Sequence, residues 1–576
     1  MPWRKLEKSS FKLQKRIYRA SQCNDIKKMH NLQRLLLKST SAKILAVRKV
    51  TQDNRGKKTA GVDGKSNLSK KERLLLANSL DIREKAKPSR RVLIPKPGRP
   101  SEHRSLGIPT ISDRAKQTLV KMVIEPEWEA KFEQNTYGFR PGRSCHDAIE
   151  AIFSALKQKT AYCLDADISG CFDNIKHYAL LEKLNTTPTL RSIIKGWLKA
   201  GVVENRTLQP TRSGTIQGGT ISPLLACIAL HGLEQYIKEA LKSELFLYRK
   251  KKFGTTSHQR AQQTLSIIFY ADDFVVMHES EEIILKAKIL IEEWLKTIGL
   301  ELKPSKTRIS HTLSGEKPGF NFLGFSIRHY RTRNSKKGYK LFIKPSRESI
   351  KQHNITIKRK LRGLRGAMQE VVIKELNPII RGWSQYYLSV VSNKTFNLMG
   401  SVMFRKLWKW AVVRHQNKGR SWIKRKYFKK YKNDNWRFMT SNKIYLTKHG
   451  DYTIKRHVKV KGTKSPYDGD WVYWGNRLKK IPGKRPRVIK LLKLQQGKCS
   501  HCQLWFKNED ILEIHHKDRN RRNNMNRNLS LLHGHCHDEL HKSMHDKHQI
   551  IEEPYEVKVS STVLKSSEEG RPSSLR

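Results

Sequence analysis

Acidic residues and long apolar runs are scarce in this 576-residue chain. It has 51 Asp and Glu against 116 Lys and Arg, which leaves a formal net charge of +65. A charge of this size exceeds what solubility requires and indicates a polyanionic partner, because binding to phosphates releases condensed counterions. The longest apolar stretch, ISPLLACIAL at 221–230, is far shorter than the ~18 residues of a membrane span, so no membrane partner is expected.

The amino terminus, MPWRKLEKSSFKLQKR, also lacks the apolar core of a secretory signal. We therefore expect an intracellular protein, cytoplasmic in a bacterium or organellar if an organelle encodes it, and not a secreted one. Hydrophobic residues make up 37% of the chain and there are 12 tryptophans, which excludes a disordered basic protein. The length predicts about three to five domains.

Cysteine is sparse, with eight residues in two populations. The first is scattered along the chain and is expected to consist of buried free thiols in a reducing compartment; it comprises Cys23, Cys145, Cys163, Cys171 and Cys227. The second, Cys499, Cys502 and Cys536, lies where nine of the 22 histidines fall within residues 499–548. This concentration indicates metal binding.

Composition and hydrophobic periodicity divide the chain into six segments. Residues 1–84 predict basic amphipathic helices, since the first 60 residues hold 17 Lys and Arg but only 3 Asp and Glu. Residues 85–345 alternate strand-like and helical stretches, as a mixed α/β domain does, and residues 346–440 predict helices rich in aromatics. The remaining segments are 441–495, a basic DNA-binding linker region with short strands and turns at KIYLTKHGDYTI and SPYDGDWVYWG; 496–548, a compact Cys/His module; and 549–576, a disordered tail.

The strongest chemical signal is FYADDF at 269–274, where apolar residues flank the adjacent Asp272 and Asp273. Two neighbouring carboxylates in a strand–turn–strand repel each other unless a cation lies between them, so the pair predicts a divalent-metal site. Asp167, which follows an apolar strand and precedes a glycine turn, is the expected third carboxylate.

These segments resemble the palm of reverse transcriptases, and specifically of group II intron-encoded proteins. Seven blocks carry the resemblance in order: IPKPGRPSEHRSLGIPT (94–110), YGFRPGRSCHDAI (137–149), DISGCFDNI (167–175), GTIQGGTISPLLA (214–226), YADD (270–273), LKPSKTRI (302–309) and FNFLGF (320–325). The resemblance implies a multidomain α+β protein shaped as a right-hand polymerase, with mixed α/β fingers and palm at 85–345 and a helical thumb or maturase domain at 346–440.

The resemblance also implies roles for individual residues. Asp167, Asp272 and Asp273, with the backbone of Ile168, would hold two Mg²⁺ ions roughly 3.5–4 Å apart for nucleotidyl transfer. The expected contacts to the incoming deoxynucleoside triphosphate are Phe172 at the sugar 2′ position, Gln217 in the QGG loop, and Lys96 and Arg104 at the phosphates, where the loop length leaves the Lys/Arg register open. Lys306 is either an acid toward the pyrophosphate or a surface lysine.

Between 401 and 435 the chain has 12 Lys and Arg, one acid and seven aromatics. Interleaved aromatics and cations can stack on bases while neutralising phosphates, although most of the tryptophans, such as Trp408, Trp410 and Trp422, fit a helical core equally well. GWSQYY (382–387) and RHQNKGRSW (414–422) resemble the maturase domain, which implies that this region binds intron RNA and helps it fold.

Two ligand pairs about thirty residues apart predict a tetrahedral structural Zn²⁺ site in the Cys/His module. The expected ligands are Cys499, Cys502, His533 and Cys536, with His535 as the spare histidine.

Between the pairs, LEIHHKDRNRRNNMNRNLSLL (512–532) resembles HNH nucleases and implies a small, zinc-supported ββα-metal domain. His516 would be the general base, and His515 and His537 would bind a catalytic Mg²⁺ or Mn²⁺ ion. Asn528 would orient the loop that presents His516, and Glu513 would hold a histidine ring. The alternative is a zinc-binding DNA module with inert histidines.

Taken together, the resemblance implies a mobile-intron protein in a ribonucleoprotein with group II intron RNA, monomeric or dimeric. The bound RNA would reverse-splice into double-stranded target DNA, the nuclease would nick the other strand, and the palm would extend that 3′ end from deoxynucleotides on the RNA template. Two alternatives stay open: a splicing-only maturase with inactive enzyme sites, and a host-recruited reverse transcriptase serving defence.

Overall fold

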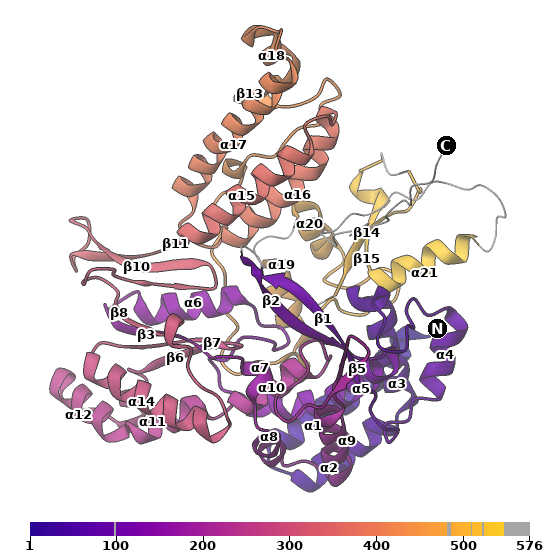
Figure 1. Cartoon of the computed structure of the whole chain (residues 1–576), viewed down its shortest axis with the longest axis vertical. Helices are drawn as coiled ribbons and strands as arrows, with labels where there is room; N and C mark the ends of the chain where they lie inside the picture. The colour runs from indigo at the N-terminus through magenta and orange to yellow at the C-terminus, as the bar shows by residue number, and fades with distance from the viewer. Residues whose placement is uncertain (97–98, 481–484, 508–509, 521–522, 546–576) are drawn as a thin grey trace, which may run out of the picture.

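The computed structural model describes residues 1–96, 99–480, 485–507, 510–520 and 523–545. The predicted disordered tail therefore lies outside the described residues. Within the described ranges, no helix has both the length and the hydrophobicity that crossing a bilayer requires. Figure 1 shows a broad body from which a group of helices projects, with the Cys/His module beside the amino-terminal helices.

The basic amino-terminal segment folds into helices α1 (Trp3–Gln22), α2 (Ile26–Lys38), α3 (Thr40–Arg48) and α4 (Lys70–Asn78). The side chains of Asp25 and Ser39 accept hydrogen bonds from the first-turn amides of α2 and α3, and a capping box of Ser69 and Glu72 begins α4. Helices α1 to α3 pack against α5 (Ile111–Lys131), so their apolar stripes are buried while most of their cations face solvent.

The central sheet, which we call the palm sheet, is antiparallel with strand order β6-β7-β3-β8. Its strands are β3 (Tyr162–Asp167), β6 (Ser266–Tyr270), β7 (Asp273–His278) and β8 (Arg308–His311). Alternate residues of β3 enter different cores: Leu164 packs in the core that contains α14 (Glu281–Thr297), and Cys163 in the core that contains α6 (Cys145–Leu156). Figure 1 shows these two helices on opposite sides of the sheet.

The other helices of this region surround the palm sheet, and the apolar stretch at 221–230 forms one of them, the buried α10. They are α7 (Cys171–Asn174), α8 (His177–Leu184), α9 (Pro188–Lys199), α10 (Ser222–Leu230), α11 (Leu233–Ala240), α12 (Lys242–Phe253) and α13 (His258–Gln262).

Two further sheets, of four and three strands, flank the palm sheet. One, in the order β2-β1-β4-β5, comprises β1 (Ser89–Lys96), β2 (Arg99–Ile108), β4 (Val202–Glu204) and β5 (Thr207–Gln209). The other, in the order β11-β10-β9, comprises β9 (Phe320–Phe322), β10 (Phe325–Arg331) and β11 (Tyr339–Pro345). Phe325, Ile327 and Ile343 of the second sheet are buried in the same core as α6.

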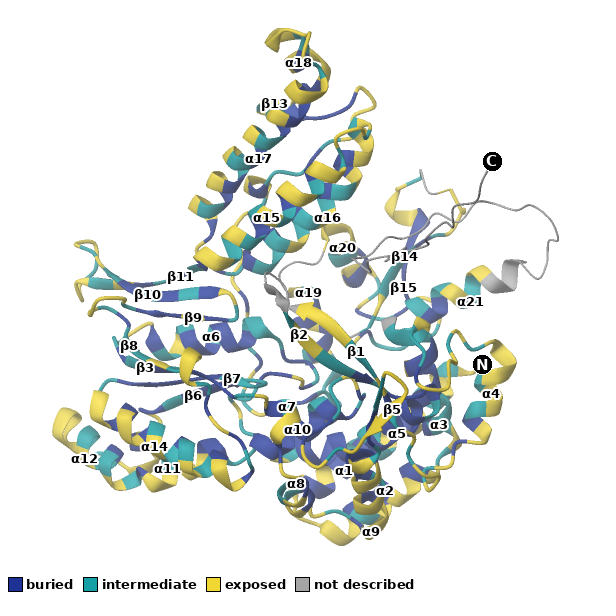
Figure 2. Cartoon of the chain, in the orientation of Figure 1, coloured by how far each residue is buried: buried dark blue, intermediate teal, exposed yellow. Residues whose placement is uncertain are grey.

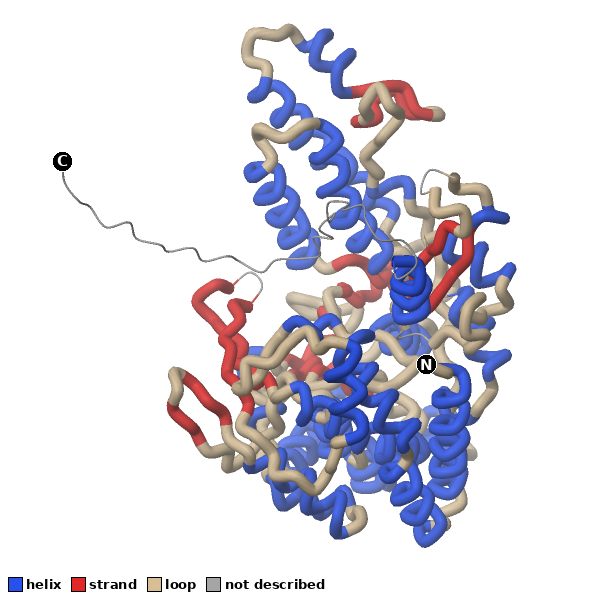
Figure 3. The backbone as a smooth tube through the Cα atoms, turned by 90° about the vertical axis from the view of Figure 1, so that its right-hand side faces the viewer, coloured by secondary structure: helices blue, strands red, loops and turns tan. Residues whose placement is uncertain are grey.

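The projecting helices are α15 (Arg347–Gly363), α16 (Gln369–Tyr387), α17 (Asn393–Arg414) and α18 (Arg420–Tyr427), followed by the hairpin β12 (Phe428–Tyr431) and β13 (Asp434–Phe438). They share a core of their own, in which Trp410 is buried and Trp408 and Trp422 are half-buried. Figure 3 shows this group standing apart from the rest of the body. These tryptophans are therefore core residues, and the cations form the outer faces that Figure 2 colours as exposed.

The predicted strands between 441 and 495 are wrong. KIYLTKHGDYTI is mostly irregular with one short 3₁₀ turn, and DWVYWG enters α19 (Trp471–Lys480), which precedes α20 (Pro486–Leu494). Aromatic residues favour strands locally, but here Trp474 packs over Gly142 of the palm, a contact that a local pattern does not encode. The Cys/His module contains β14 (Leu512–His516), β15 (Leu529–His533) and α21 (Gly534–His545).

All eight cysteines are free thiols. Cys163, Cys171 and Cys227 are buried, as predicted, whereas Cys145 is half-buried and Cys23 is exposed. For Cys23 the prediction of burial is wrong, because this residue follows the last turn of α1 and faces solvent.

Candidate polymerase site and Cys/His module

Three predicted aspartates lie together at one end of the palm sheet. Asp167 is the last residue of β3 and pairs across the sheet with Asp273, the first residue of β7. Asp272 stands in the two-residue turn between β6 and β7, and its carbonyl oxygen accepts a hydrogen bond from the Ile168 amide over 3.4 Å. The antiparallel register therefore gathers carboxylates that are more than 100 residues apart in the sequence.

The turn that carries Asp272 is tight and closely supported. Ala271 has a φ of +59°, in the left-handed region that lets two residues reverse the chain. Gly138 lies directly behind it, where an added Cβ would stand 2.2 Å from the Ala271 nitrogen, so only glycine fits. Gly138, near the start of the block at 137–149, therefore packs directly against the turn that carries Asp272.

The electrostatics of this cluster favour a bound cation. Burial, reinforced by the neighbouring Asp272 and Asp167, raises the pKa of Asp273 to about 7. Burial likewise raises the pKa of Asp272, and it raises that of Asp165, which lies on the Asp167 face of β3, to about 7. Ionising these carboxylates costs free energy when no cation is nearby. As oxygen ligands they therefore suit a divalent ion such as Mg²⁺.

Lys306 is part of this site. Its ammonium group contacts Asp167 Oδ2, and although burial opposes the charge, this contact raises the pKa of Lys306. The 3₁₀ turn Pro304–Lys306 carries the lysine, and the amide of Lys303 donates to the carbonyl oxygen of Asp167 over 2.8 Å. Of the two interpretations of Lys306 above, the geometry favours a role at the site over that of an unattached surface lysine.

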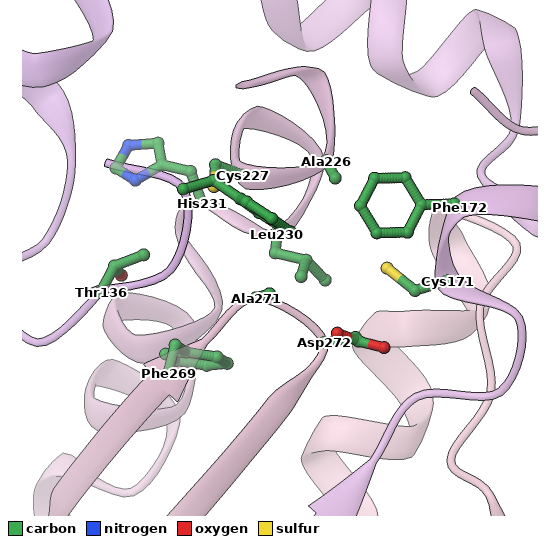
Figure 4. Close-up of a pocket in the computed structure, with 11 residues that line it drawn as sticks. Thr136, Cys171, Phe172, Ala226, Cys227, Leu230, His231, Phe269, Ala271 and Asp272 are labelled. Carbon is green, nitrogen blue, oxygen red and sulfur yellow. The ribbon is translucent and has the colours of Figure 1, made fainter. Parts of the chain in front are cut away.

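The residues predicted to contact the nucleotide surround the aspartates from three segments. Phe172 lines a pocket with Asp272 and Ala271, which Figure 4 shows between the turn and α10. The carbonyl oxygen of Gln217 accepts a hydrogen bond from the Gly107 amide over 2.7 Å, which ties the QGG loop to β2. Arg104 is exposed on β2, and its charge partly opposes the rise that burial causes in the pKa of Asp272. The side chain of Lys96 lies outside what the structure describes.

Comparison with known proteins identifies the family. The family described as "Reverse transcriptase (RNA-dependent DNA polymerase)" matches residues 94–327, the "N-terminal domain of reverse transcriptase" matches 1–80, and the "Group II intron, maturase-specific domain" matches 350–428. The chain belongs to the group II intron reverse transcriptase/maturase family. All three family matches end before the Cys/His module.

Individual relatives of this group II intron reverse transcriptase/maturase agree with that assignment. Protein YkfC of Escherichia coli is 30% identical over 332 residues, which are 52% of this chain and 84% of that protein. Group II intron-encoded protein LtrA of Lactococcus lactis is 31% identical over 305 residues, which are 44% of this chain and 49% of LtrA. Maturase-like protein 1 of Euglena gracilis is 26% identical, over 67% of this chain and 76% of that protein. The matched part therefore spans about half of LtrA.

Membership of this family implies use of a divalent metal ion, Mg²⁺, together with binding of intron RNA and of nucleotides. Asp167, Asp272 and Asp273 offer carboxylate oxygens, a donor type that fits that ion. The helices α15 to α18, which coincide with the maturase-specific match, carry the basic outer faces available to RNA.

In the Cys/His module, one set of four side chains converges as a structural metal site would require. The ligand atoms of Cys499, Cys502, His533 and Cys536 all lie within 4.8 Å of one another, and Cys502 Sγ is 3.3 Å from His533 Nδ1. The other ring nitrogen of His533 lies 3.3 Å from Asp510 Oδ2, the kind of outer contact that orients a metal-binding imidazole. Two buried thiols, a third half-buried one and an imidazole form a donor set that fits Zn²⁺.

A second histidine cluster adjoins the first. Ligand nitrogens of His515, His537 and His541 lie within 4.8 Å of one another, and His537 Nδ1 is 2.8 Å from Glu513 Oε2. Sequence reasoning anticipated His515 and His537 but missed His541. The available signal was the four-residue spacing from His537 to His541, which places both on one face of α21.

The structure puts His516 and Asn528 around the loop between β14 and β15. Asn528 Nδ2 donates to Asp518 Oδ1 over 2.7 Å, and its Oδ1 accepts from the Asp518 amide over 2.9 Å, so this side chain holds the loop that follows His516. Within the described part of the chain, His516 Nε2 has no hydrogen-bond partner. The spare His535 instead lies 3.5 Å from Asp53 Oδ1, at the contact with the amino-terminal helices.

Proposed function

We propose that this chain is a multifunctional mobile-intron protein: an RNA-directed DNA polymerase, a maturase for its group II intron RNA, and an endonuclease that nicks target DNA. The observation that carries the polymerase is the juxtaposition of Asp167, Asp272 and Asp273, which makes a splicing-only protein with inactive enzyme sites the weaker alternative. The basic outer faces of α15 to α18 support RNA binding by the maturase region.

In the polymerase reaction, Asp167, Asp272 and Asp273 would hold the metal ions. Bound Mg²⁺ would activate the primer 3′-hydroxyl and stabilise the pyrophosphate leaving group. Lys306, which stays protonated beside Asp167, supplies positive charge and a proton at the site. Phe172 closes the pocket against a sugar 2′-hydroxyl, and Arg104 offers a guanidinium to the triphosphate.

The polymerase proposal predicts that Asp272→Ala abolishes primer extension on an RNA template. Removing one carboxylate from the cluster should lower the rate by about 100-fold or more, because metal-assisted charge stabilisation contributes several kcal/mol. Asp173→Ala is the matched control, since this exposed acid lies in the same block and its pKa is shifted by burial and by Arg91 rather than by the three aspartates. Extension that survives in folded Asp272→Ala contradicts the proposal, and no synthesis by the wild type with its intron RNA favours the splicing-only alternative.

The nuclease proposal rests on the second histidine cluster. His515, His537 and His541 would hold a divalent ion such as Mg²⁺ or Mn²⁺, and His516 would take the proton from the attacking water. Asn528 keeps the intervening loop in place. The adjacent Cys499, Cys502, His533 and Cys536 would hold a structural Zn²⁺ that stabilises this small module.

This proposal predicts that His516→Ala lowers metal-dependent nicking of double-stranded DNA by about 100-fold or more while zinc content stays unchanged. Cys536→Ser should instead lower bound zinc, measured by elemental analysis, together with nicking. His501→Ala is the control, because this histidine belongs to the same module and is exposed. Zinc retained in Cys536→Ser, or nicking unchanged in His516→Ala, contradicts the assignment.

A further inference from the structure

Phe139 combines exposure with an unusual backbone conformation. Phe139 is 46% exposed, and its backbone φ is +58°. The left-handed region suits glycine and asparagine, and a bulky aromatic residue there is an outlier that its surroundings must enforce. Such residues concentrate at functional sites, since neither the exposure of the ring nor the conformation benefits stability.

Contacts on both sides of Phe139 hold its backbone in this conformation, next to the turn that carries Asp272. On one side, the Tyr137 amide donates to the carbonyl oxygen of Phe269 over 3.0 Å, and Gly138 abuts Ala271. On the other, Arg140 forms two hydrogen bonds to the carboxylate of Glu129, over 2.8 Å and 3.2 Å, with both side chains buried. The loop is thus fixed at both ends, and Phe139 cannot relax without moving the turn that carries Asp272.

The ring of Phe139 meets the ring of Phe172. Their centroids are 5.9 Å apart and their planes are inclined by 79°, an edge-to-face contact. Both residues line the pocket that also contains Ala271 and Asp272. In Figure 4, Phe172, Cys171 and Asp272 lie on the same side of that pocket. Phe172 is half-buried, and the Phe139 ring is one of the groups that pack against it.

We infer that Phe139 is a positioning residue that holds the ring of Phe172 and thereby determines how strictly the polymerase site excludes ribonucleotides. The inference rests on the proposed polymerase function. A ring at position 172 discriminates against a 2′-hydroxyl only while it stays in place, and Phe139 supplies a packing surface that an exposed ring would otherwise lack. Phe139 acts through Phe172 and touches no reacting atom in this scheme.

The test compares single-nucleotide extension of a primer on an RNA template with a deoxynucleotide and with the matching ribonucleotide. Phe139→Ala should lower the ratio of the two kcat/KM values about two- to tenfold, the range that an aromatic pair contact supplies. Phe139→Tyr keeps the ring and should retain the wild-type ratio. Phe253→Ala removes a phenylalanine that is 57% exposed at the end of α12 and serves as the control.

A double variant separates positioning from a general effect on folding. Phe172→Ala should lower the ratio more than Phe139→Ala, and adding Phe139→Ala to it should change the ratio no further, because the residue through which Phe139 acts is already missing. If the two substitutions lower the ratio additively, or if active Phe139→Ala keeps the wild-type ratio, the inference is overturned but the polymerase proposal is not. No synthesis by folded wild type would overturn the polymerase proposal, and this inference with it.

Discussion

At the scale of single residues, the palm shows how a functional site opposes stability. Asp272 and Asp273 are held within a partly buried sheet end where burial and mutual repulsion disfavour the charged carboxylates. Among the described residues, Lys306 is the one cation that contacts the cluster, through the carboxylate of Asp167. The cluster is therefore most stable when its carboxyl groups are protonated or when a metal ion is bound to them.

We expect ionisation of Asp273 to lower the free energy of unfolding as pH rises, and Asp273→Asn should remove this loss. The pKa of Asp273 is about 7 in the folded chain, against about 3.9 unfolded. Because the folded state binds the proton more tightly, wild-type stability should fall as pH rises from about 4 to about 7 and remain low above that. Asp273→Asn should thus be more stable than the wild type at pH 8 without divalent ions, by on the order of 1–3 kcal/mol in the free energy of unfolding, and should melt at a higher temperature.

Thermal melts at pH 5 and pH 8, with and without Mg²⁺, measure this cost. Mg²⁺ should stabilise the wild type mainly at pH 8 and should have little effect on Asp273→Asn. An equal gain from the substitution at both pH values would be inconsistent with a carboxylate whose pKa is raised.

At the scale of elements, residues 457–480, which we call the strap, attach the carboxy-terminal part of the chain to the palm. Asp147 of α6 is fully buried and accepts hydrogen bonds from His457 Nε2 over 3.2 Å, the Val460 amide over 2.9 Å and Arg477 Nη2 over 2.6 Å. Burial opposes ionisation here, but His457 and Arg477 outweigh it and hold the pKa of Asp147 well below its usual range. The contacts join positions more than 300 residues apart.

Asp147→Asn should release this strap. The substitution keeps the shape of the side chain but leaves the buried guanidinium of Arg477 without its counter-charge, which costs about 3–5 kcal/mol. Limited trypsin digestion should then cut within residues 455–464 faster than it does in the wild type. The control is Asp470→Asn, which removes a pair with Lys464 on a side chain that is 40% exposed and should leave stability nearly unchanged. Equal protection of wild type and Asp147→Asn would contradict the strap.

At the scale of the whole molecule, the net charge of +65 governs how the chain meets nucleic acid. The charge is spread over several elements, since the amino-terminal helices and α15 to α18 each carry exposed lysines and arginines. Each phosphate that these cations neutralise releases counterions, so affinity depends on the whole surface rather than on one residue.

The affinity of the full chain for its intron RNA should therefore fall about 10³-fold or more between about 50 mM and about 200 mM salt. Filter binding across that range measures the slope of the logarithm of affinity against the logarithm of salt concentration. An oligonucleotide analogue with an uncharged backbone is the control and should show little salt dependence. A flat response for RNA would mean that the surface charge contributes little to binding.

Part of the site could be predicted from local sequence. The adjacent Asp272 and Asp273 between apolar residues indicate a metal site because no apolar strand tolerates such a pair without a cation, and the spacing of Cys499 and Cys502 indicates zinc for a similar reason. The strands predicted between 441 and 495 failed because tertiary packing overrode the local propensity of aromatic residues.

The sequence by itself determined the charge, the order of the polymerase blocks and the types of ligand atoms, because these depend on residue identity and short spacings. Only the tertiary structure decided that Lys306 contacts Asp167, that Phe139 meets Phe172, and that Asp147 joins His457 and Arg477. Each of these contacts joins side chains that are distant in the chain, and their approach depends on strand register and helix packing summed over the whole core. No local pattern carries that information, since it arises only when the chain has closed on itself.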